Sequence, residues 1–128
     1  MPSSREVLVV DADPSHRQLI ERPLLQAGYR VDAITHGEAL GHISREDMNR
    51  YAAVVVAAVD PSATVTSRPR AGEYVLQCIA QLSPETLPRV VLLAPDQRSA
   101  ATSPKSYRIL VEPIEATQLL TAVRAMQR

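Results

Sequence analysis

The stretch Ala52–Val59, with the sequence AAVVVAAV, decides the fold of this chain. It has no charged side chain and no alternation of polar and apolar residues, and Asp60 and Pro61 close it. A strand with one solvated face would alternate, so we expect both faces of this strand to be covered, as in the middle of a parallel sheet. In open α/β sheets, ligands collect at the carboxyl ends of the strands. This strand carries only alanine and valine there, and such side chains cannot bind a metal, accept a proton or attack phosphorus.

The rest of the chain alternates between apolar strands and amphipathic helices. Further strands are expected at residues 6–10, 29–35, 89–94 and 107–111. Helices are expected at residues 14–27, 37–49, 71–82 and 115–127. Alternating strands and helices predict right-handed crossovers and a parallel sheet. The fold class is therefore α/β, a doubly wound five-stranded parallel sheet in three layers, with residues 1–128 as a single domain.

Helical spacing predicts which side chains of three helices face the core. The expected inward sets are Leu19, Ile20, Leu24 and Ala27; Val75, Leu76, Ile79 and Leu82; and Leu119, Leu120, Val123 and Met126. Pro23 lies inside the first helix and is expected to bend or break it. Two stretches carry little helix or strand signal, a polar loop at 61–72 and a segment at 97–106.

Composition limits the classes of partner. The chain has 14 basic and 14 acidic residues, so no broad positive field draws it to nucleic acid or to a membrane surface. No apolar run is long enough to cross a bilayer, and no signal peptide precedes the first strand. Cys78 is the only cysteine, which favours the reducing cytoplasm and predicts a small core residue.

Four motifs resemble the receiver (CheY-like) domain of two-component response regulators. They are VLVVDADPS at 7–15, the Gly28–Val31 turn into a strand, LVEP at 110–113 and the final amphipathic helix. The resemblance covers residues 7–128 and implies the flavodoxin-like strand order 2-1-3-4-5. The chain is shorter than the family between Ala94 and Glu112, so the fourth helix is expected to be short or missing.

Receivers of this family accept a phosphoryl group on an aspartate. By the resemblance, two acids after the first strand hold Mg²⁺, and they fall on Asp11 and Ala12. The nucleophilic aspartate falls on Ala57. One acid of the pair is thus lost, and the nucleophile has no oxygen to phosphorylate.

The other functional positions also depart from the family. The hydroxyl that binds a phosphoryl oxygen falls on Ala94, the lysine falls on Glu112, and the aromatic switch residue falls on Ile109. Glu112 brings negative charge where a phosphoryl group needs positive charge. The resemblance therefore implies a degenerate pseudo-receiver that lacks the phosphoacceptor aspartate, with no enzymatic activity, no cofactor and no metal.

The remaining acids leave alternatives open. One hypothesis is a weak cation site, or the acidic pocket of a small-molecule or ion sensor, formed by Asp11, Asp13 and Glu112. The favoured interpretation is that Asp13 only caps the following helix. Glu112 either joins Asp11 in an acidic cluster with a raised pKa and pH sensitivity, or pairs with Arg98 or Arg108, which is favoured because unpaired buried carboxylates are costly.

Asp60 is a possible displaced phosphoacceptor, but it lacks the hydroxyl and lysine partners, and its simpler role is to begin a turn with Pro61. The three histidines His16, His36 and His42 have no metal-ligand spacing and are expected in solvent. Glu112–Pro113 is a candidate cis peptide bond, as the resemblance implies.

The predicted function is phosphorylation-independent signalling through protein contact. The expected partners are another protein, the chain's own output domain (a transcription regulator, for example) or a second copy bound through the last helix and the fifth strand. No direct binding of nucleic acid or membrane is expected.

Overall fold

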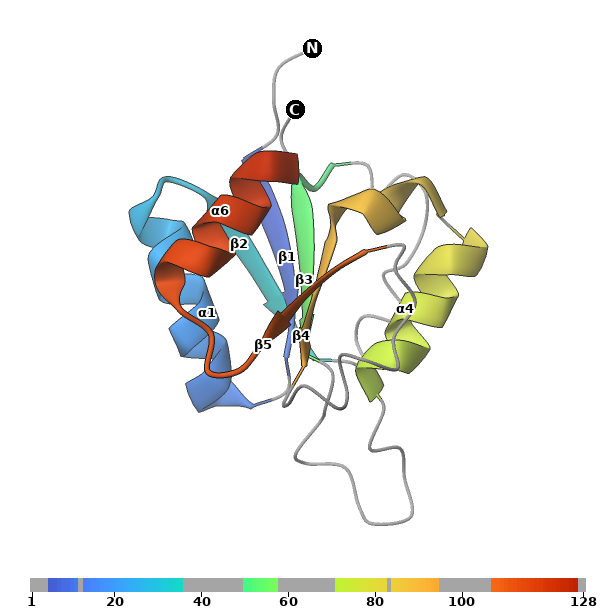
Figure 1. Ribbon diagram of the computed structural model, residues 1–128, viewed down its shortest axis with the longest axis horizontal. Coiled ribbons are helices and arrows are strands. Elements are labelled where there is room, and N and C mark those ends of the chain that lie inside the picture. The colour runs from blue at the N-terminus through green and yellow to red at the C-terminus, as the bar shows by residue number, and fades with distance from the viewer. Residues whose placement is uncertain are drawn as a thin grey trace.

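Five short strands form one parallel sheet at the centre of the molecule (Figure 1). The computed structural model describes residues 5–11, 13–35, 50–57, 71–82, 84–94 and 107–126. The strands are β1 Glu6–Val10, β2 Arg30–Ile34, β3 Ala53–Ala57, β4 Val90–Ala94 and β5 Arg108–Val111. The helices are α1 Pro14–Gln26, α4 Ala71–Leu82, the 3₁₀ helix η1 Pro84–Arg89 and α6 Ala116–Met126.

The strand order is β2-β1-β3-β4-β5, and every pairing is parallel. Val9 shows the register at the centre, because it lies beside Ala33 of β2 and Val55 of β3. This arrangement confirms the predicted α/β fold with order 2-1-3-4-5. η1 was not predicted from the sequence; it begins at Pro84, two residues after the end of α4.

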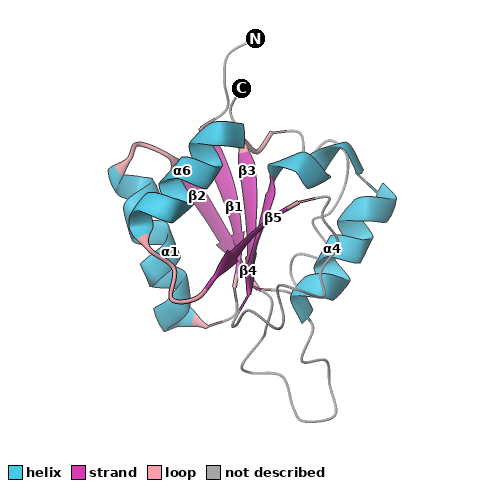
Figure 2. Ribbon diagram, viewed as in Figure 1, coloured by secondary structure: helices cyan, strands magenta, loops and turns pink. Residues whose placement is uncertain are grey.

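The sheet is apolar on both faces because its central strands β1, β3 and β4 carry no polar side chain after Glu6, the first residue of β1. Figure 2 shows helices on either side of the strands, which makes three layers. Val7, Val9 and Val55 pack with α1 and α6. Their neighbours Leu8, Val54 and Val56 point to the opposite face and pack with α4. Side chains of a strand alternate between faces, so an unbroken apolar strand supplies both cores at once.

Most of the predicted inward positions are buried, and two are wrong. Leu19 is 70% exposed, because the buried stripe of α1 passes through Ile20 and Leu24 and Leu19 lies about 100° around the helix from Ile20. Leu82 is 54% exposed; it is the last residue of α4 and takes no part in the apolar cluster that the helix covers. α1 runs unbroken through Pro23, so the alternative of a broken helix is also wrong.

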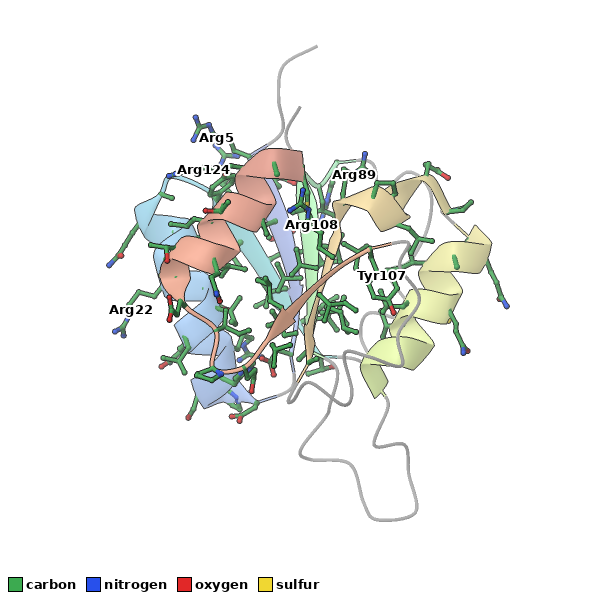
Figure 3. The ribbon with its side chains drawn as sticks, in the orientation of Figure 1. Arg5, Arg22, Arg89, Tyr107, Arg108 and Arg124 are labelled. Carbon is green, nitrogen blue, oxygen red and sulfur yellow. The ribbon has the colours of Figure 1, made fainter. Side chains whose placement is uncertain are left out.

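A polar cluster joins the amino ends of β1 and β3 to Asp32 in the middle of the edge strand β2. The Tyr51 hydroxyl donates to Asp32 Oδ2 at 2.9 Å, and Arg50 Nη2 lies 3.1 Å from the same oxygen. The Arg50 guanidinium also stacks on the Tyr51 ring and pairs with Glu6. In Figure 3, Arg5 and Arg124 lie at this same end of the sheet.

Several predicted features lie outside the described residues. They are the helix at 37–49, the loop at 61–70, the segment at 97–106 that includes the expected short fourth helix, and the side chains of Ala12, His36, His42, Asp60 and Arg98. Within the described ranges, no helix has the length and apolar character needed to span a membrane.

Leu24 and Leu19 provide a matched test of the α1 packing. Leu24 is fully buried, so Leu24→Ala is expected to lower the free energy of unfolding by about 2–5 kcal/mol. Leu19→Ala removes the same atoms from an exposed site and is expected to change it by less than about 0.5 kcal/mol. Urea denaturation of both variants measures the difference, and equal losses would contradict this packing.

Candidate functional site

The carboxyl ends of the strands meet at the lower edge of the sheet in Figure 1. The chain leaves β1 toward β2 on one side, whereas β3, β4 and β5 lie on the other side, so the crossover direction changes between β1 and β3. A crevice for ligands is expected at such a switch point. Asp11, Ala57, Ala94 and Glu112 all lie at this edge, as the sequence predicted.

Among the described residues of this edge, Asp11 is the one deeply buried carboxylate. It directly follows β1, is 1% exposed, and its backbone N–H donates to the Ile34 carbonyl at 2.9 Å. Asp11 Oδ1 accepts the backbone N–H of Asp13 at 3.0 Å. The other oxygen, Oδ2, contacts Nδ1 of His16. A buried carboxylate must be hydrogen-bonded or paired, and Asp11 satisfies this with two different partners.

His16 lies between two carboxylates, and the expectation that it is solvated is wrong. Its Nδ1 contacts Asp11 Oδ2, and its Nε2 contacts Glu112 Oε1. The ring therefore links the start of α1 to the ends of β1 and β5. The helical periodicity of the sequence could have predicted this inward position, because His16 precedes the buried Ile20 by four residues and so lies on the same face of α1.

The surroundings of His16 shift its proton affinity. Partial burial lowers the pKa of His16, but the hydrogen bond and charge of Asp11, together with the charge and hydrogen bond of Glu112, outweigh it and hold this pKa above its ordinary value. Glu112 thus pairs with His16, whereas pairing with an arginine, Arg98 or Arg108, was favoured from the sequence; Arg98 lies outside the described residues. The Glu112–Pro113 peptide bond is cis.

Asp13 caps helix α1, which was the favoured interpretation. Its Oδ1 accepts the backbone N–H of Ser15 at 3.1 Å, and Pro14 occupies the first turn, where no N–H is needed. Arg17 follows in the same turn; its Nη1 lies 3.4 Å from the Asp11 carbonyl, and its side chain pairs with Glu21. The Asp13 carboxylate therefore serves as the amino-terminal cap of α1.

Alanines occupy the next two strand ends. Ala57, the last residue of β3, is 5% exposed, and Ala94, the last residue of β4, is fully buried. The Ala94 carbonyl accepts the backbone N–H of Glu112 at 2.9 Å, which places Glu112 next to β4. Both side chains are methyl groups, so neither position offers an oxygen to a ligand.

The acids of this edge do not fit a magnesium ion. Mg²⁺ takes oxygen ligands in near-octahedral geometry, usually carboxylates and waters. Both oxygens of Asp11 are already engaged, and Asp13 Oδ1 accepts a helix N–H. In the described part of the chain, no three His, Cys, Asp or Glu side chains are grouped to hold a metal ion.

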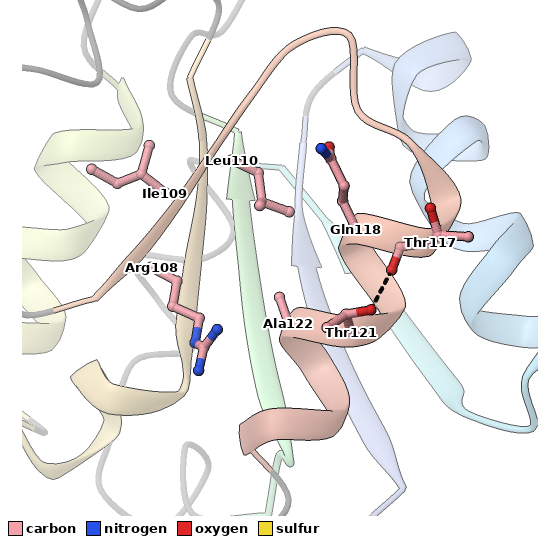
Figure 4. A pocket seen from close by; sticks show the side chains of 7 residues that line it. All are labelled: Arg108, Ile109, Leu110, Thr117, Gln118, Thr121 and Ala122. Carbon is pink, nitrogen blue, oxygen red and sulfur yellow. Dashed lines mark hydrogen bonds between the residues drawn. The ribbon is translucent and has the colours of Figure 1, made fainter.

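A groove lies between β5 and α6 (Figure 4). It has a volume of about 460 Å³ and is lined by Arg108, Ile109, Leu110, Thr117, Gln118, Thr121 and Ala122. Ile109, at the expected switch position, also packs against the core beneath α4. The Thr121 hydroxyl donates to the Thr117 carbonyl at 2.7 Å, so its proton is used within α6.

Several solved structures that align with this chain are receiver domains of signalling proteins. A response regulator of Chloroflexus aurantiacus aligns with a TM-score of 0.74 at 22% identity, over 99% of this chain and 98% of its own. The chain has the fold of a response regulator receiver domain. The beryllofluoride-activated NtrC4 receiver dimer aligns at 0.72 and 20% identity, over 96% of each chain.

The magnesium-bound receiver domain of a Pseudomonas aeruginosa sensor histidine kinase aligns at 0.70 and 17% identity, over 97% of this chain and 98% of its own. At these identities the likeness concerns the receiver fold. Neither a protein-family model nor a curated protein sequence matches the chain.

The cap of α1 gives a direct test of this edge. Asp13→Ala removes the acceptor of the Ser15 N–H and is expected to cost about 0.5–2 kcal/mol of the free energy of unfolding. Asp13→Asn keeps a capping oxygen, so its free energy of unfolding is expected to fall by only about 0.3 kcal/mol. Thermal and urea unfolding of the two variants compare the costs; a loss as large in Asp13→Asn would point to a role for the charge itself.

Proposed function

We propose that this chain is a phosphorylation-independent, receiver-like signalling domain, a pseudo-receiver that acts through protein contact. The observation that carries the proposal is Ala57, which ends β3 where the receiver resemblance implies the phosphoacceptor aspartate. A methyl group can neither attack phosphorus nor bind a metal. An acyl phosphate therefore cannot form on the side chain at this position. The chain is proposed to have no enzymatic activity.

The charges of the pocket support the same proposal. Phosphoryl transfer needs cations against the oxygens of the transferred group. Glu112 is an acid where the resemblance implies a lysine, and the nearest charged partner of both Glu112 and Asp11 is His16. An incoming phosphate would meet two carboxylates and would have to displace their histidine.

Association is proposed to use the groove between β5 and α6, with a second copy of the chain as the partner. Arg108 lies at the groove, and Leu110 and Ala122 add apolar surface beside the polar side chains of α6. The NtrC4 neighbour is a receiver dimer, which supports this mode of signalling for the fold. An output domain, for example a transcription regulator, or another cytoplasmic protein would occupy the same surface in a longer assembly.

Two alternatives are less well supported. A phosphoacceptor role for Asp60 has no observation in its favour, because that residue lies outside the described part of the chain. A small-molecule or ion sensor would need free acids, whereas Asp11, Asp13 and Glu112 all have partners within the chain. A ligand-dependent rise in thermal stability would favour the sensor.

Phosphotransfer is tested by exposing the protein to acetyl phosphate and Mg²⁺ and measuring its intact mass. No phosphorylated species is expected, because Ala57 has no nucleophilic oxygen. The amide NMR spectrum is likewise expected to stay unchanged on addition of Mg²⁺ and beryllofluoride. A conventional receiver domain, treated in parallel, is the positive control. A phosphorylated product, or shifts of the Asp11 amide with beryllofluoride, would overturn the proposal.

Self-association is tested by sedimentation as a function of concentration. Wild type is expected to form a dimer, and Arg108→Glu is expected to weaken it by about tenfold or more, because the new charge reverses the potential at the groove. Arg124→Glu makes the same charge change on α6 but outside the groove, so it serves as the matched control. Equal effects of the two variants would place the interface elsewhere.

A further inference from the structure

His16 presents both ring nitrogens to carboxylate oxygens, and this fixes the protonation that the arrangement requires. Nδ1 meets Asp11 Oδ2, and Nε2 meets Glu112 Oε1. An ionised carboxylate only accepts hydrogen bonds, so each contact needs an N–H from the ring. Neutral imidazole has one N–H, whereas imidazolium has two. With both acids ionised, only the cationic ring satisfies both contacts.

We infer that His16, as imidazolium, supplies the positive charge of this pocket, in place of the metal ion and lysine that the receiver resemblance implies. Its two N–H groups, bound to Asp11 and Glu112, hold α1 to the turn between β5 and α6. We call this bridge of Asp11, His16 and Glu112 the latch.

The other charged groups near the ring leave this role to His16. On α1, the Asp13 carboxylate caps the Ser15 N–H, and the Arg17 side chain lies against the Asp11 carbonyl and Glu21. Between β5 and α6, Glu115 is exposed and has no contact with the ring among the described residues. β3 and β4 end in the uncharged Ala57 and Ala94. Among these groups only His16 bridges the two acids.

The two arms of the latch differ in strength. The side chain of Asp11 is 2% exposed, and a second hydrogen bond from the Asp13 N–H holds it. The side chain of Glu112 is 32% exposed and can be hydrated where it stands. When the ring loses one proton, the remaining N–H is better used on the buried acid, because an unsatisfied buried carboxylate is costly. The contact between His16 Nε2 and Glu112 is therefore the one that breaks when the ring loses a proton.

The pH dependence follows from the direction of the shift. Asp11 and Glu112 hold the pKa of His16 above its unfolded value despite burial. A raised folded pKa means that the latch contributes its full stability below the unfolded value of about 6.5 and loses it as pH rises through the folded pKa. Rising pH therefore loosens the turn that leads into α6, whose first two turns line the groove.

This inference rests on the proposed function only in that last link, from the turn to the contact surface. The latch itself depends on the contacts of the ring. It makes protons, instead of phosphate and Mg²⁺, the signal to which the pocket responds.

The test is NMR titration of the His16 ring nitrogens in the full chain, with the chain unfolded in urea as the reference. Wild type is expected to show both nitrogens protonated at low pH and a titration midpoint above the unfolded one. Glu112→Gln keeps the shape of the side chain and removes its charge, so the midpoint is expected to fall. Glu115→Gln, a neighbouring acid without a contact to the ring, is the matched control and is expected to leave it unchanged.

A second measurement uses the pH dependence of unfolding, which stays informative even where a variant is less stable. Wild type and Glu115→Gln are expected to lose stability as pH rises through the His16 midpoint, and His16→Gln is expected to lose this dependence. A His16 midpoint at or below the unfolded one, or a midpoint that Glu112→Gln leaves in place, would overturn the latch alone. Phosphorylation by acetyl phosphate with the His16 titration unchanged would overturn the proposed function alone.

Discussion

A parallel sheet buried on both faces is the constraint on which the other features of this molecule depend. Burial of both faces requires apolar side chains at consecutive positions of β1, β3 and β4, and the strands supply them almost without interruption. Polar groups are then confined to the strand ends. Arg50 and Tyr51, just before β3, form a cluster with Asp32 of the edge strand β2, and at the carboxyl ends polar groups form the Asp11–His16–Glu112 bridge.

The carboxyl edge holds two acids beside strand ends that carry only alanine. Asp11 stays buried beneath the start of α1, so it needs a hydrogen bond and a counter-charge. Without a lysine at the end of β5, the cation comes from the adjoining helix instead. His16 is on the inward stripe of α1, and its ring is long enough to reach both acids.

The internal bridge and the groove that we propose for association then occupy different parts of the molecule. The bridge closes the carboxyl edge, whereas the groove between β5 and α6 opens beside it and is lined by a mixture of charged, polar and apolar side chains. The two regions share one connection, the short turn from Glu112 to α6. A change in the bridge therefore reaches the groove through covalent structure, and no long path through the core is required.

Local patterns of the sequence determined the five strands, α1, α4 and α6, the parallel sheet and the alanines at the strand ends, because apolar runs, helical spacing and capping residues act over a few positions. The strand order came from the resemblance to receiver domains. They misplaced Leu19 and Leu82, since a stripe of leucines on a short helix permits more than one inward face. Only the tertiary structure paired Glu112 with His16. Those residues are 96 positions apart, and parallel crossovers bring β5 beside β4 and α1 over the same edge. No local pattern specifies a contact of that range, which depends on how the whole sheet is assembled.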